Sequence, residues 1–340
     1  MFKRILTLIT IVCPLSLAAQ HIAIGERTFK FNDSSRNRPV TTEVWYPTND
    51  AYTAADSSYE YPFVHIPVIR NAHIPTSKHP LVIISHGTGG GRITLEWLAD
   101  ALVQKGFIVA AVDHWGNTYN NKIAIDFVTP WQRPLDISFA VTQLLGDKEF
   151  GSVIDQNRIG AAGFSIGGYT GIALAGGRLD FDALMNYMTA GDGRKTIAIP
   201  EFPDLMKSVK IDDVKESFRR SPDLMDKRIK AFFIICPAIG QGFERKSQLS
   251  RINKPFFIVG AQSDSIAPSK LNAEHYHHLI KGSGLVVIPG KVGHYAFLNE
   301  GVGEFKKHGG IYTNDDSSVD RHAVHKQVGD LAAKFFLKSM

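Results

Sequence analysis

The stretch RIGAAGFSIGG, residues 158–168, places one serine between glycines at the end of an apolar run. The small and apolar residues up to Phe164 predict a buried strand, and the glycine- and alanine-rich residues after Ser165 predict a helix. A sharp turn from strand to helix holds a serine side chain above the end of the strand. Glycines at positions 163 and 167 leave room for this turn, because larger side chains would crowd it. Gly-x-Ser-x-Gly alone is a loose pattern, so the surrounding sequence must show whether Ser165 is a nucleophile.

Predicted strands and helices alternate on both sides of this turn. Five further apolar runs have the length and composition of strands buried on both faces: PLVIISHG, FIVAAVDH, AFFIICP, PFFIVGAQ and GLVVIPG. Helical patterns lie between several of them, as in LEWLADALVQKG and RPLDISFAVTQLL. Earlier in the chain, residues 22–31 and 40–46 read as extended segments and residues 48–79 as a long surface excursion. The order predicts an α/β fold with a mostly parallel central sheet and helices on both faces.

Residues 177–230 interrupt this alternation. Phe181, Leu184, Met185 and Met188 follow helical spacing on one face, which predicts an amphipathic helix, and a second helix-like segment follows. The segment is either a lid over the site or a helical decoration of the fold, and the sequence leaves both open. We therefore expect residues 21–340 to form a single domain with a helical insertion at 177–230.

The first twenty residues have the pattern of a secretory signal peptide. Lys3 and Arg4 precede a short apolar run that ends in the small residues Ala18 and Ala19. The prediction is a secreted or periplasmic protein, the alternative being an uncleaved N-terminal anchor. Without the leader, the net charge falls from +5 to +3, which argues against nucleic acid as a partner. No second apolar stretch reaches membrane-spanning length, and the remaining cysteine, Cys236, has no partner for an intramolecular disulfide.

A serine hydroxyl becomes nucleophilic only beside a base that is itself oriented by a further group. On a sheet of this kind, the partners follow the serine in the order acid, then histidine, at later strand ends. Asp264 follows PFFIVGAQ and His294 follows GLVVIPG, so both meet this condition. Asp113 also follows a strand but precedes the serine. His275 and His278 share a helix face without a carboxylate or thiol, so we expect no metal site there.

The glycine-rich loop 86–91, HGTGGG, follows the first central strand. Two backbone N–H groups must stabilise the oxyanion that develops during acyl transfer. One is expected from Ile166, directly after the serine, and the other from Thr88, whose glycine neighbours allow close approach to a ligand. A phosphate-binding loop is the alternative, but no Lys-Ser/Thr pair follows the glycines.

Taken together and in order, these motifs resemble the α/β-hydrolase superfamily over about residues 80–300. They are most similar to the group of predicted dienelactone hydrolases that includes the platelet-activating-factor acetylhydrolases, on the motifs SHGTGG, AAVDHWGNT, WQRPLDISFAVTQLL, GFSIGG, AQSDSIAP and GHYAFL. The resemblance implies Ser165 as nucleophile, Asp264 as acid, His294 as base, and Thr88 and Ile166 as oxyanion donors. The family has His-Pro-Gly-Asn where this chain has HWGN, so Trp115 departs from its pattern and is a candidate for the substrate pocket. True dienelactone hydrolases use a cysteine nucleophile, and the serine here favours ester hydrolysis.

The sequence therefore predicts a serine hydrolase that cleaves carboxylic esters through an acyl-enzyme, without metal or organic cofactor. Short acyl groups, including acetyl groups on lipids or carbohydrates, fit the family best, and Phe181, Met185 and Met188 are candidates for an apolar substrate contact. A lactone, peptide or amide hydrolase on the same triad is an alternative, as is a non-catalytic binding protein on a hydrolase scaffold. No feature of the sequence determines the oligomeric state.

Overall fold

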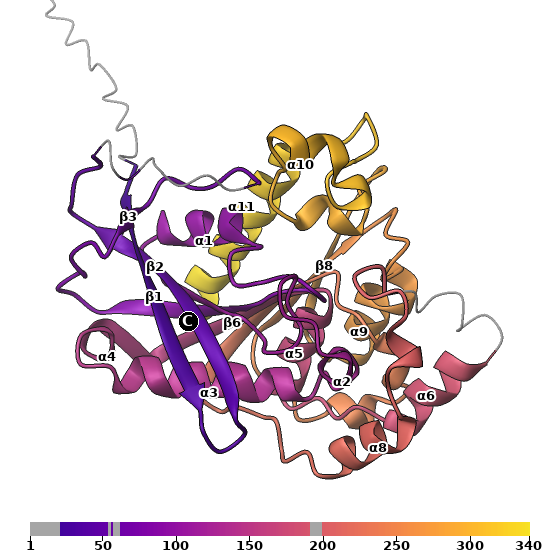
Figure 1. Cartoon of the computed structure of the whole chain (residues 1–340). Helices are drawn as coiled ribbons and strands as arrows, with labels where there is room; N and C mark the ends of the chain where they lie inside the picture. Colours follow the sequence, from indigo (N-terminus) through magenta and orange to yellow (C-terminus); the bar gives the residue numbers. More distant parts are fainter. Residues whose placement is uncertain (1–20, 54–55, 57–61, 191–198) are drawn as a thin grey trace, which may run out of the picture.

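A mixed sheet forms the centre of the computed structural model, which describes residues 21–53, 56, 62–190 and 199–340. The predicted signal peptide, residues 1–20, lies outside the described residues. Figure 1 shows the sheet in the middle of the molecule. Within the described residues it has nine strands in the order β3-β1-β2-β5-β4-β6-β7-β8-β9. Their bounds are β1 Ala23–Asp33, β2 Arg38–Thr48, β3 Ile69–Arg70, β4 His79–Ser85, β5 Ile108–Val112, β6 Ile154–Phe164, β7 Ile229–Ile235, β8 Phe256–Ala261 and β9 Gly284–Ile288.

In sheet order, the strands from β5 through β4 to β9 run parallel to their neighbours. The antiparallel pairs lie at the edge that the N-terminal strands form. β1 pairs antiparallel with β2, and β2 pairs antiparallel with β5. The strands predicted at 22–31 and 40–46 are thus confirmed as β1 and β2. The predicted surface excursion at 48–79 is partly wrong, because it contains β3, which adds a short parallel edge to β1. The reason is burial: Ile66, Val68 and Ile69 pack into the core from this segment.

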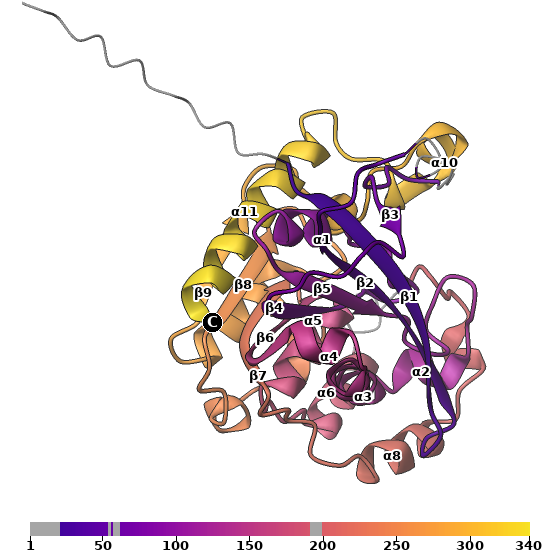
Figure 2. The ribbon, with the colours of Figure 1, turned by 90° about the vertical axis from the view of Figure 1, so that its left-hand side faces the viewer.

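Helices cover both faces of the sheet, as predicted for an α/β fold. Helices α1 (Glu96–Val103) and α11 (Arg321–Ser339) pack on one face, while α3 (Gln132–Gly146) and α5 (Ile166–Leu174) pack on the other (Figure 2). Helix α9 (Ala273–Leu279) joins the same apolar cluster as α3 and α5. Two apolar clusters, one on each face, fill the space between helices and sheet. Burying both faces explains why the central strands read as continuous apolar runs. Three short helices lie at the periphery: α2 Ala124–Val128, α4 Phe150–Val153 and α10 Gly303–His308.

The predicted helical insertion is confirmed. It contains α6 (Phe181–Thr189), a 3₁₀ turn at Leu205–Lys207 and α8 (Ile211–Arg219), which lie together at one end of the molecule (Figure 1). Phe181 of α6 stacks on Phe218 of α8, and both rings contact Trp131, which precedes α3. The Trp131 indole N–H also donates a hydrogen bond to Ser217, at 3.0 Å. An aromatic cluster therefore attaches the described part of the insertion to the main body.

In the described part of the chain, no helix combines the length and the apolar character needed to cross a membrane.

Candidate active site

Ser165 lies at the turn between β6 and α5, as the sequence predicts. It has φ 58° and ψ −121°, a backbone conformation that non-glycine residues rarely adopt. A Cβ atom at Gly163 would clash with the carbonyl oxygen of Gly167, and one at Gly167 would clash with the carbonyl oxygen of Ser85. The Ser165 backbone N–H donates a 2.9 Å hydrogen bond to Ile235, at the end of the neighbouring strand β7. The strained turn is therefore held by close backbone packing on two sides.

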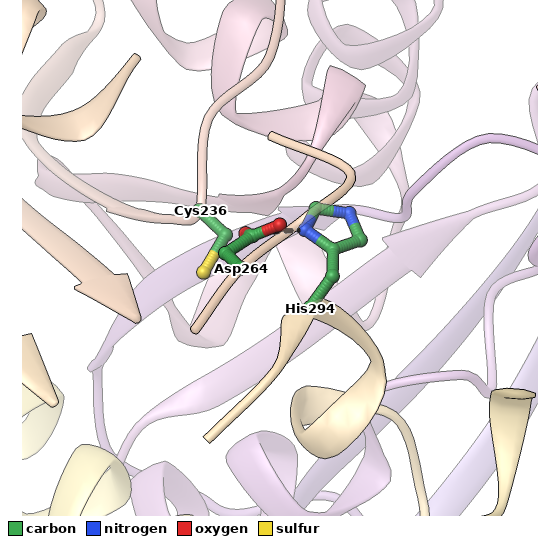
Figure 3. Close-up of side chains that lie close together, drawn as sticks. All are labelled: Cys236, Asp264 and His294. Atoms are coloured by element: carbon green, nitrogen blue, oxygen red, sulfur yellow. Dashed lines mark hydrogen bonds and ion pairs between the residues drawn. The ribbon is translucent and has the colours of Figure 1, made fainter. Parts of the chain in front are cut away.

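A continuous chain of hydrogen bonds joins Ser165 to the two partners predicted from the sequence. His294 begins the 3₁₀ turn His294–Phe297 after β9, and its Nε2 lies 2.9 Å from Ser165 Oγ. Its Nδ1 lies 2.6 Å from Asp264 Oδ2, in the loop after β8 (Figure 3). All three side chains are buried, and Ser165 is 7% exposed. Residues far apart in the sequence thus meet in the geometry of a nucleophile, base and acid.

The surroundings of Asp264 keep it ionised. Its other oxygen, Oδ1, accepts hydrogen bonds from the backbone N–H groups of Ile266 and Ala267, at 2.9 and 2.7 Å. Burial alone would raise the pKa of Asp264, but the hydrogen bond and charge of His294 and the Ala267 amide outweigh burial and lower it. An ionised acceptor beside Nδ1 holds a ring proton of His294 on that nitrogen. Nε2 is then free to accept the proton of Ser165.

Cys236, at the end of β7, lies beside this chain of residues. One ligand atom each of Cys236, Asp264 and His294 falls within 4.8 Å of the others (Figure 3). Burial raises the pKa of the Cys236 thiol well above its usual value, so the sulfur is protonated at neutral pH. A metal requires the thiolate and a free imidazole nitrogen, whereas both His294 nitrogens are hydrogen-bonded. Cys236, Asp264 and His294 therefore fit an acid–base pair with a neutral thiol beside it better than they fit a metal centre.

The loop after β4 contains Thr88, the predicted second oxyanion donor. The Gly89 N–H donates to Asn117 Oδ1 at 2.9 Å, and the Gly90 N–H donates to the Gly87 carbonyl at 3.2 Å. By contrast, the described residues offer no acceptor to the backbone N–H of Thr88 or of Ile166. Both residues line the same cavity as Ser165 and His294. This arrangement is compatible with two converging donors for an oxyanion.

The cavity above Ser165 has a volume of about 640 Å³ and a predominantly apolar lining. Phe181, Met185 and Met188 line it from α6, so the insertion supplies part of its wall. Trp115 does not lie among its lining residues, and the structure corrects that prediction. Trp115 as a whole residue is 37% exposed, while its carbonyl oxygen accepts a 3.2 Å hydrogen bond from Arg38. At this position the backbone carbonyl, and not the indole ring, makes a hydrogen bond inside the protein.

A second Ser–His–Asp chain supports the glycine-rich loop. The sequence predicts no role for these three residues. Ser85 Oγ lies 2.9 Å from His114 Nε2, and His114 Nδ1 lies 3.0 Å from Asp136 Oδ2. Asp136 also accepts two hydrogen bonds from Arg38, at 3.0 and 2.9 Å. Ser85, His114 and Asp136 are almost completely buried and do not line the cavity. The fully buried Arg133 adds a hydrogen bond to the His86 carbonyl at the start of the loop. These residues position the loop, and their sequence signal is limited to polar residues inside the motifs SHGTGG, AAVDHWGNT and WQRPLDISFAVTQLL.

Comparison with known proteins supports the resemblance drawn from the sequence. The family model described as "Platelet-activating factor acetylhydrolase, isoform II" matches residues 48–124, which include the glycine-rich loop and His114. No curated protein sequence gives a significant match.

Among solved structures, the chain is similar to a ferulic acid esterase from Streptomyces cinnamoneus. The two share 20% sequence identity and superpose with a TM-score of 0.63, over 95% of this chain and 91% of the esterase. As many as 1026 solved chains match, so this likeness identifies the architecture, which is the α/β-hydrolase fold predicted from the sequence, and not a substrate.

Proposed function

We propose that the protein is a serine esterase that hydrolyses small carboxylic esters, with short acyl groups such as acetyl, through an acyl-enzyme. The observation that carries the proposal is the Ser165–His294–Asp264 hydrogen-bond chain at the floor of an apolar cavity. The partial match to the platelet-activating-factor acetylhydrolase model and the esterase among the structural neighbours support ester chemistry. The apolar lining suits an ester with a lipid or other apolar part.

In the proposed mechanism, Ser165 Oγ attacks the ester carbonyl carbon while His294 Nε2 takes the hydroxyl proton. Asp264 stabilises the imidazolium that forms and keeps the ring oriented. The backbone N–H groups of Thr88 and Ile166 stabilise the oxyanion of the tetrahedral intermediate. His294 then protonates the departing alcohol, and a water molecule, deprotonated by His294, attacks the acyl-enzyme to release the acid. The overall reaction consumes one ester and one water and yields one acid and one alcohol.

We further propose that the chain is exported, in keeping with the basic and apolar pattern of residues 1–20. Among the described residues Cys236 is a free cysteine, and two buried core clusters stabilise the fold.

The test is hydrolysis of 4-nitrophenyl esters of increasing acyl length by the wild type and by Ser165→Ala. We expect the highest kcat/KM with short acyl chains and a loss of about 10³-fold or more in the variant. A fluorophosphonate probe should label Ser165 in the wild type and fail to label it in His294→Ala. Ser152→Ala is the matched control, because Ser152 is an exposed serine that does not line the cavity, and the variant should keep the label on Ser165. Equal turnover by the wild type and Ser165→Ala would reject the proposal.

A further inference from the structure

One carboxyl group, that of Glu201, lies in the predominantly apolar cavity. Among the described residues that line the cavity, Glu201 is the only aspartate or glutamate. It follows α6 in the insertion, and its side chain packs against the glycine-rich loop: a Cβ atom at Gly89 would lie 2.9 Å from Glu201 Cβ and Cγ. On its other side, the Tyr295 hydroxyl donates a 2.8 Å hydrogen bond to Glu201 Oε1. Glu201 thus lies between Gly89, which follows Thr88, and Tyr295, which follows His294.

This half-buried carboxyl group has two hydrogen-bond donors in the described chain, the Tyr295 hydroxyl and the backbone N–H of Glu201 itself. No ion pair of Glu201 occurs within the described chain, and the nearby Lys122 amine donates instead to the Glu201 backbone carbonyl, at 2.8 Å. Burial raises the pKa of Glu201, against the opposing effects of its hydrogen bonds and of the charges of His294 and Lys122. A partly desolvated carboxyl gains from every hydrogen-bond donor that reaches it. A carboxylate has about four acceptor sites, so the two donors that reach Glu201 leave capacity for a further one.

We propose that Glu201 is a specificity-determining residue that accepts a hydrogen bond from a free hydroxyl group on the substrate. The proposal rests on the esterase function above and narrows its substrate class. Because the acyl group proposed there is short and apolar, the hydroxyl belongs to the alcohol part. The preferred substrates are then partial esters of a polyol, in which a free hydroxyl lies a few bonds from the ester and an apolar portion fills the rest of the cavity.

A purely structural role for Glu201 makes a different prediction. In that case Glu201 matters because its bond to Tyr295 attaches the insertion to the segment that carries His294. Breaking the bond from either side would then lower activity on all esters alike. If Glu201 accepts a hydrogen bond from the substrate hydroxyl, removing Glu201 changes the preference between substrates. Loss of the Tyr295 hydroxyl does not change it.

The experiment compares kcat/KM for 2-hydroxyethyl acetate and 2-methoxyethyl acetate, which differ in one hydrogen-bond donor. We expect the wild type to prefer the hydroxy ester by about tenfold or more, as for a hydrogen bond to a charged group. Glu201→Met should reduce this ratio to near one, Glu201→Gln should retain part of it, and Tyr295→Phe should keep it while removing the bond to Glu201. A wild-type ratio near one, or a ratio unchanged in Glu201→Met, would overturn the proposal.

Ser165-dependent hydrolysis of 4-nitrophenyl acetate, measured on the same preparations, reports the esterase function separately. If that hydrolysis occurs and the hydroxy ester is not preferred, only the role of Glu201 is wrong. If the wild type hydrolyses none of the three esters, both the esterase function and the role of Glu201 are wrong.

Discussion

Replacing Asp264 by asparagine tests how the acid controls the proton on His294. The two backbone N–H groups that point at Oδ1, from Ile266 and Ala267, require an acceptor there. The asparagine must therefore direct its carbonyl oxygen to them and its NH₂ group to His294 Nδ1. That nitrogen then has to accept, so the ring proton moves to Nε2, and Nε2 can no longer take the proton of Ser165.

The structure allows an estimate of how strongly this arrangement is favoured. Flipping the amide would leave two backbone N–H groups, one buried and one partly buried, facing an NH₂ group. Each orphaned donor costs roughly 2 kcal/mol. The productive arrangement would then lie about 4 kcal/mol higher, which corresponds to a loss of roughly 10³-fold. Loss of the carboxylate that stabilises the imidazolium adds to this, so we expect kcat to fall by about 10³- to 10⁴-fold. The same substitution in Ser–His–Asp proteases has an effect of about 10⁴-fold.

The assay is steady-state hydrolysis of 4-nitrophenyl acetate, with thermal unfolding measured on the same samples. Asp264→Asn should leave KM within a fewfold and keep the fold, because the backbone hydrogen bonds to its side chain are retained. Asp113→Asn is the matched control, since Asp113 also follows a strand but binds Arg92 instead of a histidine. A kcat for Asp264→Asn within tenfold of the wild type, in a folded protein, would refute the reasoning.

Three further predictions concern the support of the site. Gly163→Ala should lower the free energy of unfolding, measured by urea titration, by about 3 kcal/mol or more, because the new Cβ atom clashes with backbone atoms. Gly146→Ala is the control: a Cβ atom there has no neighbour within 4 Å, so the variant should not be destabilised. Asp136→Asn should cost about 3–5 kcal/mol, since it leaves the buried Arg38 short of its partner; a loss below 1 kcal/mol would contradict this. Burial lowers the pKa of His114 to about 3, while the unfolded chain has a value near 6.5. Its contribution to stability is therefore full above about pH 6.5 and falls by about 1.4 kcal/mol per pH unit toward pH 3. His114→Gln should reduce the slope of the free energy of unfolding against pH by about 1.4 kcal/mol per pH unit, the equivalent of one proton. An unchanged slope would show that His114 titrates normally.

The predicted triad and the strands that carry it depend on local sequence patterns. Buried parallel strands are continuous apolar runs, and the residue that follows each run lies at the same edge of the sheet. Ser165, Asp264 and His294 each directly follow such a strand or its short loop. The glycines around Ser165 report a turn in which any side chain would meet backbone atoms. For these reasons the fold, the order of the candidate triad and the glycine-rich loop could all be predicted before the structure.

Side-chain partners that come from distant segments could not be predicted in this way. Whether Trp115 enters the cavity depends on the direction of one side chain in a turn, and the structure directs it toward solvent.

The support beneath the loop depends on contacts across 98 residues, between Arg38 and Asp136. The position of Glu201 depends on its hydrogen bond to Tyr295, 94 residues away. Strand and turn patterns are properties of neighbouring residues, so the sequence alone determined the scaffold and the candidate catalytic groups. The surroundings that tune those groups form only when the chain packs, and the tertiary structure alone decided them.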